Sequence, residues 1–384
     1  MYVDLNPKLL TWARERAGLS VSDLAPKFAK LKTWEDGSGR PTIKQLEKFA
    51  KAVRVPFGFL FLDLPPEESL PIPDFRTIKN TELIRPSPDL IETIHDCQEK
   101  QAWYIDYSIE NGLKTLDWID SESPNTRPIK AAMRMRNIID LQLSEQIKSA
   151  SFDDFLRLLV SKIEDAGVMV LVNGVVGQNS WRPLSVEEFR GFTLVNNLAP
   201  LIFINGRDSK AAQLFTLAHE FAHLLAGKTG LSNMTGVQSD GFKSTEIWCN
   251  RVASEFLVPR QRLGEIAASC PLETPLHEAV RKEFKVSDLV ALIALKNAKL
   301  IDKENFEKHW KEAQKHWKEV KKKHQENKGG GDYYRTSSSR NGKRLTRAVI
   351  ADALGGKTLY RDAFSLLNLK ESTFKEQAKK FGMV

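Results

Sequence analysis

The stretch FTLAHEFAHLL, residues 215–225, places His219 and His223 four positions apart, with Glu220 directly after the first histidine. Positions i and i+4 of a helix lie one turn apart on the same face, so two imidazoles spaced in this way can bind one metal ion. Glu220 points about 100° away from that face, within reach of a water molecule at the ion but poorly placed as a ligand. This is the H-E-x-x-H arrangement, and the alternative interpretation is a buried helix with two hydrogen-bonded histidines.

The residues around this pattern favour a helix. Ser209 is suited to the N-cap position and Gly227 to the position just after the last turn. Most of the residues between them are good helix formers such as alanine and leucine. We therefore expect one helix between Ser209 and Gly227 to carry both histidines.

A metal centre of this kind needs a third protein ligand. The segment STEIWCNRVASEFLVP, residues 244–259, predicts a second helix that begins at a serine or threonine and ends before a proline. Glu246 and Asn250 share one face of that helix, whereas Glu255 lies on the opposite face, toward solvent. Asp240 falls in a loop between glycines. The predicted third ligand is therefore Glu246, and Asn250 is predicted to orient a ligand side chain.

Two histidines and a glutamate favour zinc, and they also suit manganese or iron. The chemistry predicted for such a site is amide hydrolysis, in which the ion polarises the scissile carbonyl and Glu220 acts as general base. A further group must stabilise the oxyanion. Its candidates are His277, Tyr333 and Tyr334, which the sequence does not rank.

The chain resembles the ImmA/IrrE family of bacterial metallopeptidases. Besides the two helices, the resemblance rests on the segments EEFRGFTLVNNLAPLIFING (187–206), SKAAQLFTLAHE (209–220), PDFRT (73–77) and GGDYYRTSSSRNGKRLTR (330–347). It implies a gluzincin-like fold, zinc held by His219, His223 and Glu246, and Glu220 as the base. Family members studied as peptidases cut helix-turn-helix repressors, so the implied partner is such a repressor, a toxin–antitoxin component or another neighbour-encoded protein.

We predict an α+β, mostly helical fold with a small sheet, whose strands lie at 168–173, 191–196 and 200–205. Helices are expected at 88–109 and 150–167. The predicted segments are a helix-turn-helix-like domain at 1–64, a proline-rich linker at 65–87, a zincin-like peptidase domain at 88–300, a basic amphipathic helix at 301–330 and a small helical region at 331–384. In the basic helix, we expect His309, His316 and His324 to be solvated.

The N-terminal segment resembles the helix-turn-helix domain of the XRE repressor family through WEDG (34–37) and RPTIKQLEKFA (40–50). The stretch from Ala25 to Trp34 is shorter than in that family by about one helical turn, or ~4 residues. The missing turn falls where the recognition helix should present side chains to the major groove. We therefore expect a degenerate domain that contacts protein instead of reading DNA.

Charge and composition set further bounds. The net charge is +8, but residues 308–347 hold 13 Lys/Arg and 4 Asp/Glu. The rest of the chain has 44 Lys/Arg and 45 Asp/Glu and is therefore nearly neutral. This basic segment is suited to nucleic acid, to an acidic partner or only to solvent. The three cysteines are widely separated, and there is no long apolar run and no signal-peptide core, so we expect a cytoplasmic protein that does not enter a membrane.

The sequence leaves several alternatives open. The glycine-rich stretch 227–243 is either a simple connector or a mobile lid. The chain could be a non-proteolytic regulator or antitoxin-type binding partner with a structural metal, although such a site has no need for Glu220. It could also be a DNA-binding transcription regulator with a peptidase-like sensor domain, which the basic segment favours and the shortened helix-turn-helix opposes. The oligomeric state does not follow from the sequence.

Overall fold

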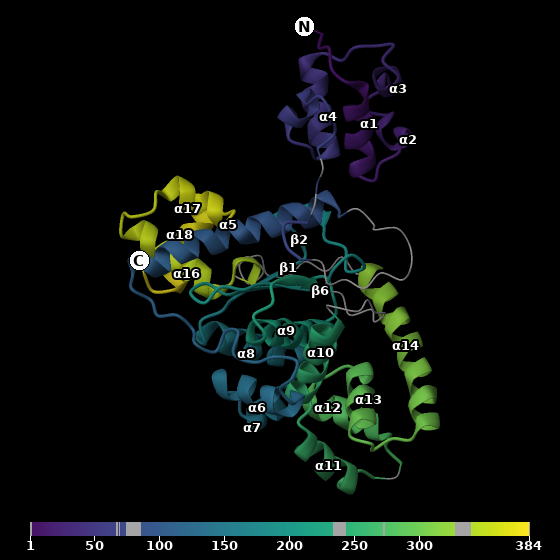
Figure 1. The fold of residues 1–384 in the computed structure, drawn as a ribbon, viewed down its shortest axis with the longest axis vertical. Helices are drawn as coiled ribbons and strands as arrows, with labels where there is room; N and C mark the ends of the chain where they lie inside the picture. The colour runs from purple at the N-terminus through teal and green to yellow at the C-terminus, as the bar shows by residue number, and fades with distance from the viewer. Residues whose placement is uncertain are drawn as a thin grey trace. The chain divides into compact units, whose positions relative to one another are not determined.

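The computed structural model describes residues 2–66, 68, 70–73, 86–232, 243–271, 273–326 and 339–383 (Figure 1). The chain divides into two compact units, residues 1–71 with 80–95 and residues 72–79 with 96–384. The fold is α+β and mostly helical with a small mixed sheet, as predicted. Among the helices of the described ranges, none is both long enough and apolar enough to cross a membrane.

The first unit is a small helical bundle. Its core gathers apolar side chains from every helix, and Trp34 packs edge-on against Phe28 at 6.2 Å between ring centroids. An ion pair between Arg14 and Glu35 joins the first and third helices, with Nε and Oε1 2.7 Å apart. The helices are α1 (Pro7–Arg16), α2 (Val21–Leu24), α3 (Leu31–Glu35), α4 (Ile43–Val53) and the 3₁₀ helix η1 (Phe57–Phe61).

The shortened part of this unit corresponds to α2 and α3, which have 4 and 5 residues. At 1.5 Å of rise per residue, α3 is only about 7 Å long. Such a helix presents few side chains to a groove, which agrees with the reasoning from the sequence. That the unit does not read DNA stays a prediction.

A four-stranded sheet lies at the centre of the second unit, in the order β1-β5-β4-β6. Strand β1 (Met169–Asn173) pairs in parallel with β5 (Leu201–Asn205), whereas β4 (Gly191–Leu194) is antiparallel to both β5 and β6 (Gly230–Ser232). The three predicted strands are β1, β4 and β5. Strands β2 (Val175–Val176) and β3 (Asn179–Pro183) form a separate hairpin.

Helices cover both faces of this sheet. Figure 1 shows α5 (Pro88–Glu110) above it and α8 (Phe152–Asp165), α9 (Lys210–Leu225) and α10 (Lys243–Leu257) below it. The amide of Gln101 on α5 donates to the carbonyls of Leu194 and Ala199, at 3.0 and 2.7 Å. The remaining helices are α6 (Pro128–Ile138), α7 (Leu143–Lys148), α11 (Arg260–Ser269), α12 (Leu276–Phe284), α13 (Asp288–Asn297), α14 (Lys303–Glu326), α16 (Lys343–Leu354), α17 (Tyr360–Leu366) and α18 (Glu371–Lys380).

Helix α9 is the central element of the core. Every residue from Gln213 to Leu225 is buried. Its apolar side chains pack in one cluster with Phe155 of α8, Ile204 of β5 and Phe256 of α10. A helix that is buried all round cannot shift without disturbing each of these neighbours, so the residues it carries are held rigidly.

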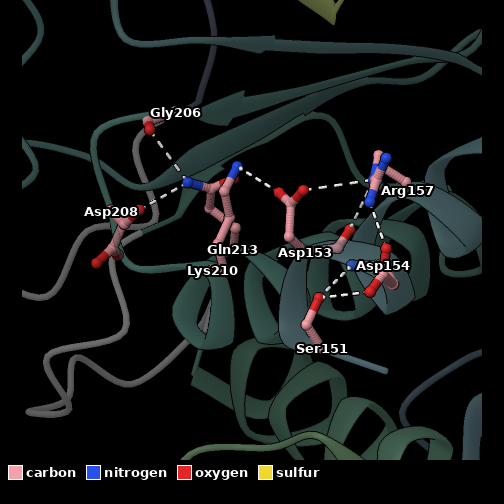
Figure 2. Close-up of polar contacts among 8 residues, drawn as sticks. All are labelled: Ser151, Asp153, Asp154, Arg157, Gly206, Asp208, Lys210 and Gln213. Carbon is pink, nitrogen blue, oxygen red and sulfur yellow. Dashed lines mark hydrogen bonds and ion pairs between the residues drawn. The ribbon is translucent and has the colours of Figure 1, made fainter. Parts of the chain in front are cut away.

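Polar contacts fix the start of α9, as Figure 2 shows. Ser209 caps the helix as predicted, because its hydroxyl accepts from the Ala212 amide at 3.3 Å. The Gln213 side chain donates to the carbonyls of Gly206 and Asp208, at 3.1 and 2.6 Å. Lys210 reaches Asp153 of α8, with Nζ and Oδ1 3.3 Å apart. The helix is thus tied both to the end of β5 and to its neighbouring helix.

We predict that Gln213→Leu lowers the free energy of unfolding by about 1–3 kcal/mol, because it leaves two carbonyl oxygens near the helix start without a donor. Urea denaturation followed by circular dichroism measures the change. The control is Lys210→Gln, which removes only a half-exposed ion pair and should destabilise much less. Equal effects of the two substitutions would contradict the role given to Gln213.

Candidate metal centre

His219 and His223 of α9 converge with Glu246 of α10. The two Nε2 atoms lie 3.0 Å apart. Glu246 Oε2 is 3.3 Å from Nε2 of His219, and Glu246 Oε1 is 2.9 Å from Nε2 of His223. These are the three side chains of the described ranges that form a group able to hold a metal ion. The two histidines are fully buried, and the glutamate side chain is 16% exposed, so the group is open on the side of the glutamate.

The packing of α10 against α9 brings Glu246 to the histidines. Cys249, Val252 and Phe256 of α10 are buried in the same core cluster as α9. The indole of Trp248 donates to the carbonyl of Thr126 at 2.8 Å. These contacts set the rotation of α10 about its axis, and Glu246 then falls on the face that meets α9.

The donor set suits a divalent cation. Two nitrogens bound to one tetrahedral zinc ion, each about 2.0–2.1 Å from it, are about 3.3 Å apart. The pairwise distances of 2.9–3.3 Å among the three donors are close to this value. Three protein ligands also leave a fourth position open, which is typical of catalytic and not of structural zinc sites.

The protonation of the three side chains is strongly coupled. Burial opposes the charge on Glu246, but its hydrogen bonds and proximity to both histidines hold the pKa of its carboxyl far below the usual range. Burial likewise opposes a charge on His219, yet the carboxylate of Glu246 outweighs it and raises the pKa of that imidazole. A carboxylate held in its charged form favours a cation between these groups.

Asn250 lies one turn after Glu246 on α10. Its side chain lies near His219 and adds to the rise in the pKa of that imidazole, after the larger effect of Glu246. The structure therefore places the amide beside the imidazole that it was predicted to orient.

Glu220 is buried beside the histidines. Its Oε2 accepts a hydrogen bond from the hydroxyl of Thr193, at 2.8 Å, whereas its Oε1 is buried without a partner in the described part of the chain. Burial raises the pKa of Glu220, although both histidines and Thr193 act in the opposite direction. A buried carboxylate with one oxygen left over is costly unless something else uses that oxygen.

Two residues of β4 that sequence reasoning missed shape this corner of the site. Thr193 fixes one oxygen of Glu220. A Cβ atom at Gly191 would lie 2.7 Å from Cγ2 of Thr216, 2.9 Å from the carbonyl of Phe203 and 3.2 Å from Oε1 of Glu220. The signal in the sequence is a glycine and a threonine inside an otherwise apolar strand, where glycine often marks a close approach.

Other candidates lie elsewhere. Glu255 was expected to face solvent, but its side chain is only 15% exposed, because Arg260 at the start of α11 pairs with it at 3.0 Å. His277 packs its ring against His309, with centroids 4.6 Å apart, and is not among the residues that converge here. His309 was expected to be solvated, and this is wrong: it is 22% exposed and lies 3.1 Å from Glu312.

Several predictions concern residues that the structure leaves undescribed. Asp240 and most of the glycine-rich stretch, 233–242, lie outside the described residues, as do Tyr333, Tyr334 and most of PDFRT. The side chains of His316 and His324 lie outside them as well. The lid and the oxyanion-stabilising tyrosines therefore stay predictions.

Residues 164–296 match the M78 peptidase family model, described as an IrrE N-terminal-like domain. The matched segment contains the four-stranded sheet, α9, α10 and each residue of the candidate centre, and the match indicates a metallopeptidase-like or IrrE-like domain. Residues 341–380 match a second family model, described as a domain of unknown function. Neither match reaches the N-terminal unit. No curated protein matches the chain.

We expect the purified protein to carry close to one divalent cation per chain. Glu246→Gln or His223→Ala should remove most of it, because each substitution takes away one of three donors. Inductively coupled plasma mass spectrometry of the dialysed protein identifies and counts the ion. Glu255→Gln, on the same helix but turned away from the site, is the control and should keep the ion. Full occupancy in the first two variants would overturn the assignment of ligands.

Proposed function

We propose that the protein is a metal-dependent endopeptidase, with zinc as its ion, that cuts a specific regulatory protein in the cytoplasm. One observation carries this proposal. Glu220 is a buried carboxylate beside three converging metal donors; Thr193 holds one of its oxygens, and the other has no partner among the described residues. A purely structural metal site has no use for such a group.

The chemistry is peptide-bond hydrolysis. His219, His223 and Glu246 would hold the ion, which when bound polarises the scissile carbonyl and makes an attacking water molecule more acidic. Glu220 takes a proton from that water at Oε1 and passes it to the leaving amine. Thr193 holds the other oxygen, which limits rotation of the carboxylate.

We infer narrow specificity. A site that cut every unfolded chain would damage a cytoplasm, so selection of one partner is the more reasonable role. The resemblance to the ImmA/IrrE family supports a helix-turn-helix regulator or a toxin–antitoxin component as that partner. We expect the N-terminal helical unit, whose α3 has only 5 residues, to contact such a protein. Casein should therefore be cut slowly or not at all.

We predict that Glu220→Gln keeps its metal and its fold but loses proteolysis by a factor on the order of 10² to 10⁴, because the general base is removed while the three ligands stay. The measurement combines metal content with cleavage of proteins encoded by neighbouring genes, followed by mass spectrometry of the products. Loss of the metal would make Glu220 a ligand. Tight binding of a neighbour-encoded protein with no cleavage, equal in wild type and variant, would favour a non-proteolytic binding module.

A second prediction concerns Thr193. Replacing it by valine keeps the shape but removes the hydroxyl that holds Glu220, and a hydrogen bond to a charged group contributes about 1.5–3 kcal/mol. We expect Thr193→Val to lower kcat by about 10- to 100-fold at unchanged metal content. Thr193→Ser restores the hydroxyl and should recover most of the rate. Equal rates in the valine and serine variants would show that this hydrogen bond does not position the base.

A further inference from the structure

A cavity lies away from the metal centre, between α5, α8 and the start of α16. Its volume is about 520 Å³, within the range of about 300–1,000 Å³ that is typical of small-molecule sites. No step of the proposed hydrolysis uses it. Its lining residues are Tyr104, Tyr107, Leu113, Ser161, Glu164, Asp165, Lys343, Arg344, Arg347, Ala348, Ala351, Phe381 and Met383.

Three cationic side chains line this cavity from the first turns of α16. Lys343 and Arg347 are one helical turn apart, on the same face, and both are exposed. Neither forms an ion pair with any carboxylate of the described ranges. Arg344 is held more firmly, because its Nη1 donates to the carbonyl of Glu164 at 3.0 Å and its guanidinium lies 5.7 Å from the ring centroid of Tyr104. Its Nε is buried and lacks a partner in the described part of the chain.

The acidic residues of the lining do not cancel these charges. Glu164 is only 5% exposed, and its Oε1 already accepts from the backbone amide of Arg344 at 3.0 Å. Burial raises the pKa of Glu164 to about 7, so this carboxyl carries less negative charge than an ordinary glutamate. Asp165 is the other acid of the lining. The side chains that line the cavity therefore carry a net positive charge, which favours an anion.

The rest of the lining is apolar or aromatic except for Ser161. Tyr107 stacks on Trp103 with centroids 5.3 Å apart and an interplanar angle of 15°, which fixes the orientation of its ring. Leu113, 39% exposed, lines the same cavity with Phe381 and Met383. Such a surface suits the face of a flat ring, whereas an inorganic anion alone would leave it in contact with water.

We propose that this cavity binds a small ligand of the nucleotide class, in which a flat ring is joined to a phosphate. The phosphate would lie between Lys343 and Arg347, and the ring would pack on Tyr107, Leu113 and Phe381. Arginine and lysine are the usual partners of phosphate oxygens.

The position of the cavity suggests what binding would do. Lys343, Arg344 and Arg347 belong to the segment that matches the domain of unknown function, and Glu164 begins the segment that matches the peptidase family. The two segments touch closely here, since a Cβ at Gly342 would be 2.7 Å from the carbonyl of Val170 on β1. A ligand in the cavity contacts both segments and would stabilise their junction.

Binding of adenosine monophosphate to the full chain tests the proposal. Isothermal titration calorimetry and the melting temperature are the readouts, with adenosine and inorganic phosphate as probes of the two halves of the ligand. The test variant is Lys343→Gln with Arg347→Gln. The control, Lys357→Gln with Arg361→Gln, removes the same charge from exposed residues of the same C-terminal segment that do not line this cavity.

We expect the wild type and the control to bind adenosine monophosphate equally within twofold, and the test variant at least tenfold more weakly. Adenosine and phosphate alone should each bind more weakly than the joined molecule. Equal binding by the test variant and the control, or no binding by the wild type, would overturn the proposal. So would binding of a single-stranded oligonucleotide that requires Lys343 and Arg347 while adenosine monophosphate does not bind. None of these results depends on proteolysis, so they test ligand binding independently of the proposed enzyme activity.

Discussion

The constraint on which the site depends is the burial of α9. This helix passes through the core of the second unit with apolar neighbours on all sides, yet it carries two imidazoles and a carboxylate in adjacent turns. Polar groups in such surroundings are expensive unless each has a partner. Glu246 from α10 pairs with the two imidazoles, and the hydroxyl of Thr193 from β4 donates a hydrogen bond to one oxygen of Glu220. Among the polar atoms left without a partner in the described part of the chain is Oε1 of Glu220, the atom that a reacting water would use.

The same constraint explains the packing around the site. The sheet lies close enough to α9 that only glycine fits at position 191. The threonine two residues later points to the same side of β4, as the alternation of a strand requires, and so meets the same glutamate. At its start, α9 is tied to the end of β5 by Gln213 and to α8 by Lys210. Catalytic groups on regular elements that are anchored in this way keep their geometry better than groups on loops.

The cavity beside α16 differs from the metal centre in how its charged groups are arranged. Helix α16 begins against β1 and α8, where Glu164 accepts from its first turn. That carboxyl is buried and bonded, and within the described residues Lys343 and Arg347 form no ion pair with it. The metal centre is a buried group of donors, whereas this cavity has cationic side chains beside aromatic rings. The two sites are built from different segments, 219–246 and 343–347. The first is suited to a cation, whereas the ligand proposed for the second is an anion.

The sequence by itself determined the features that depend on local spacing. The helix that carries the histidines, its cap at Ser209, the second helix with Glu246 and Asn250 on one face and the three main strands all follow from periodicities of 3.6 and 2. The packing around α9 was decided only by the tertiary structure, because it joins elements far apart in the chain: Thr193 and Gly191 against Glu220, Arg260 over Glu255 and His309 against His277. The cavity at α16 likewise needs residues 104, 164 and 344 together. Spacing along one element predicts which side chains share a face, but which face meets which neighbour depends on packing of the whole core.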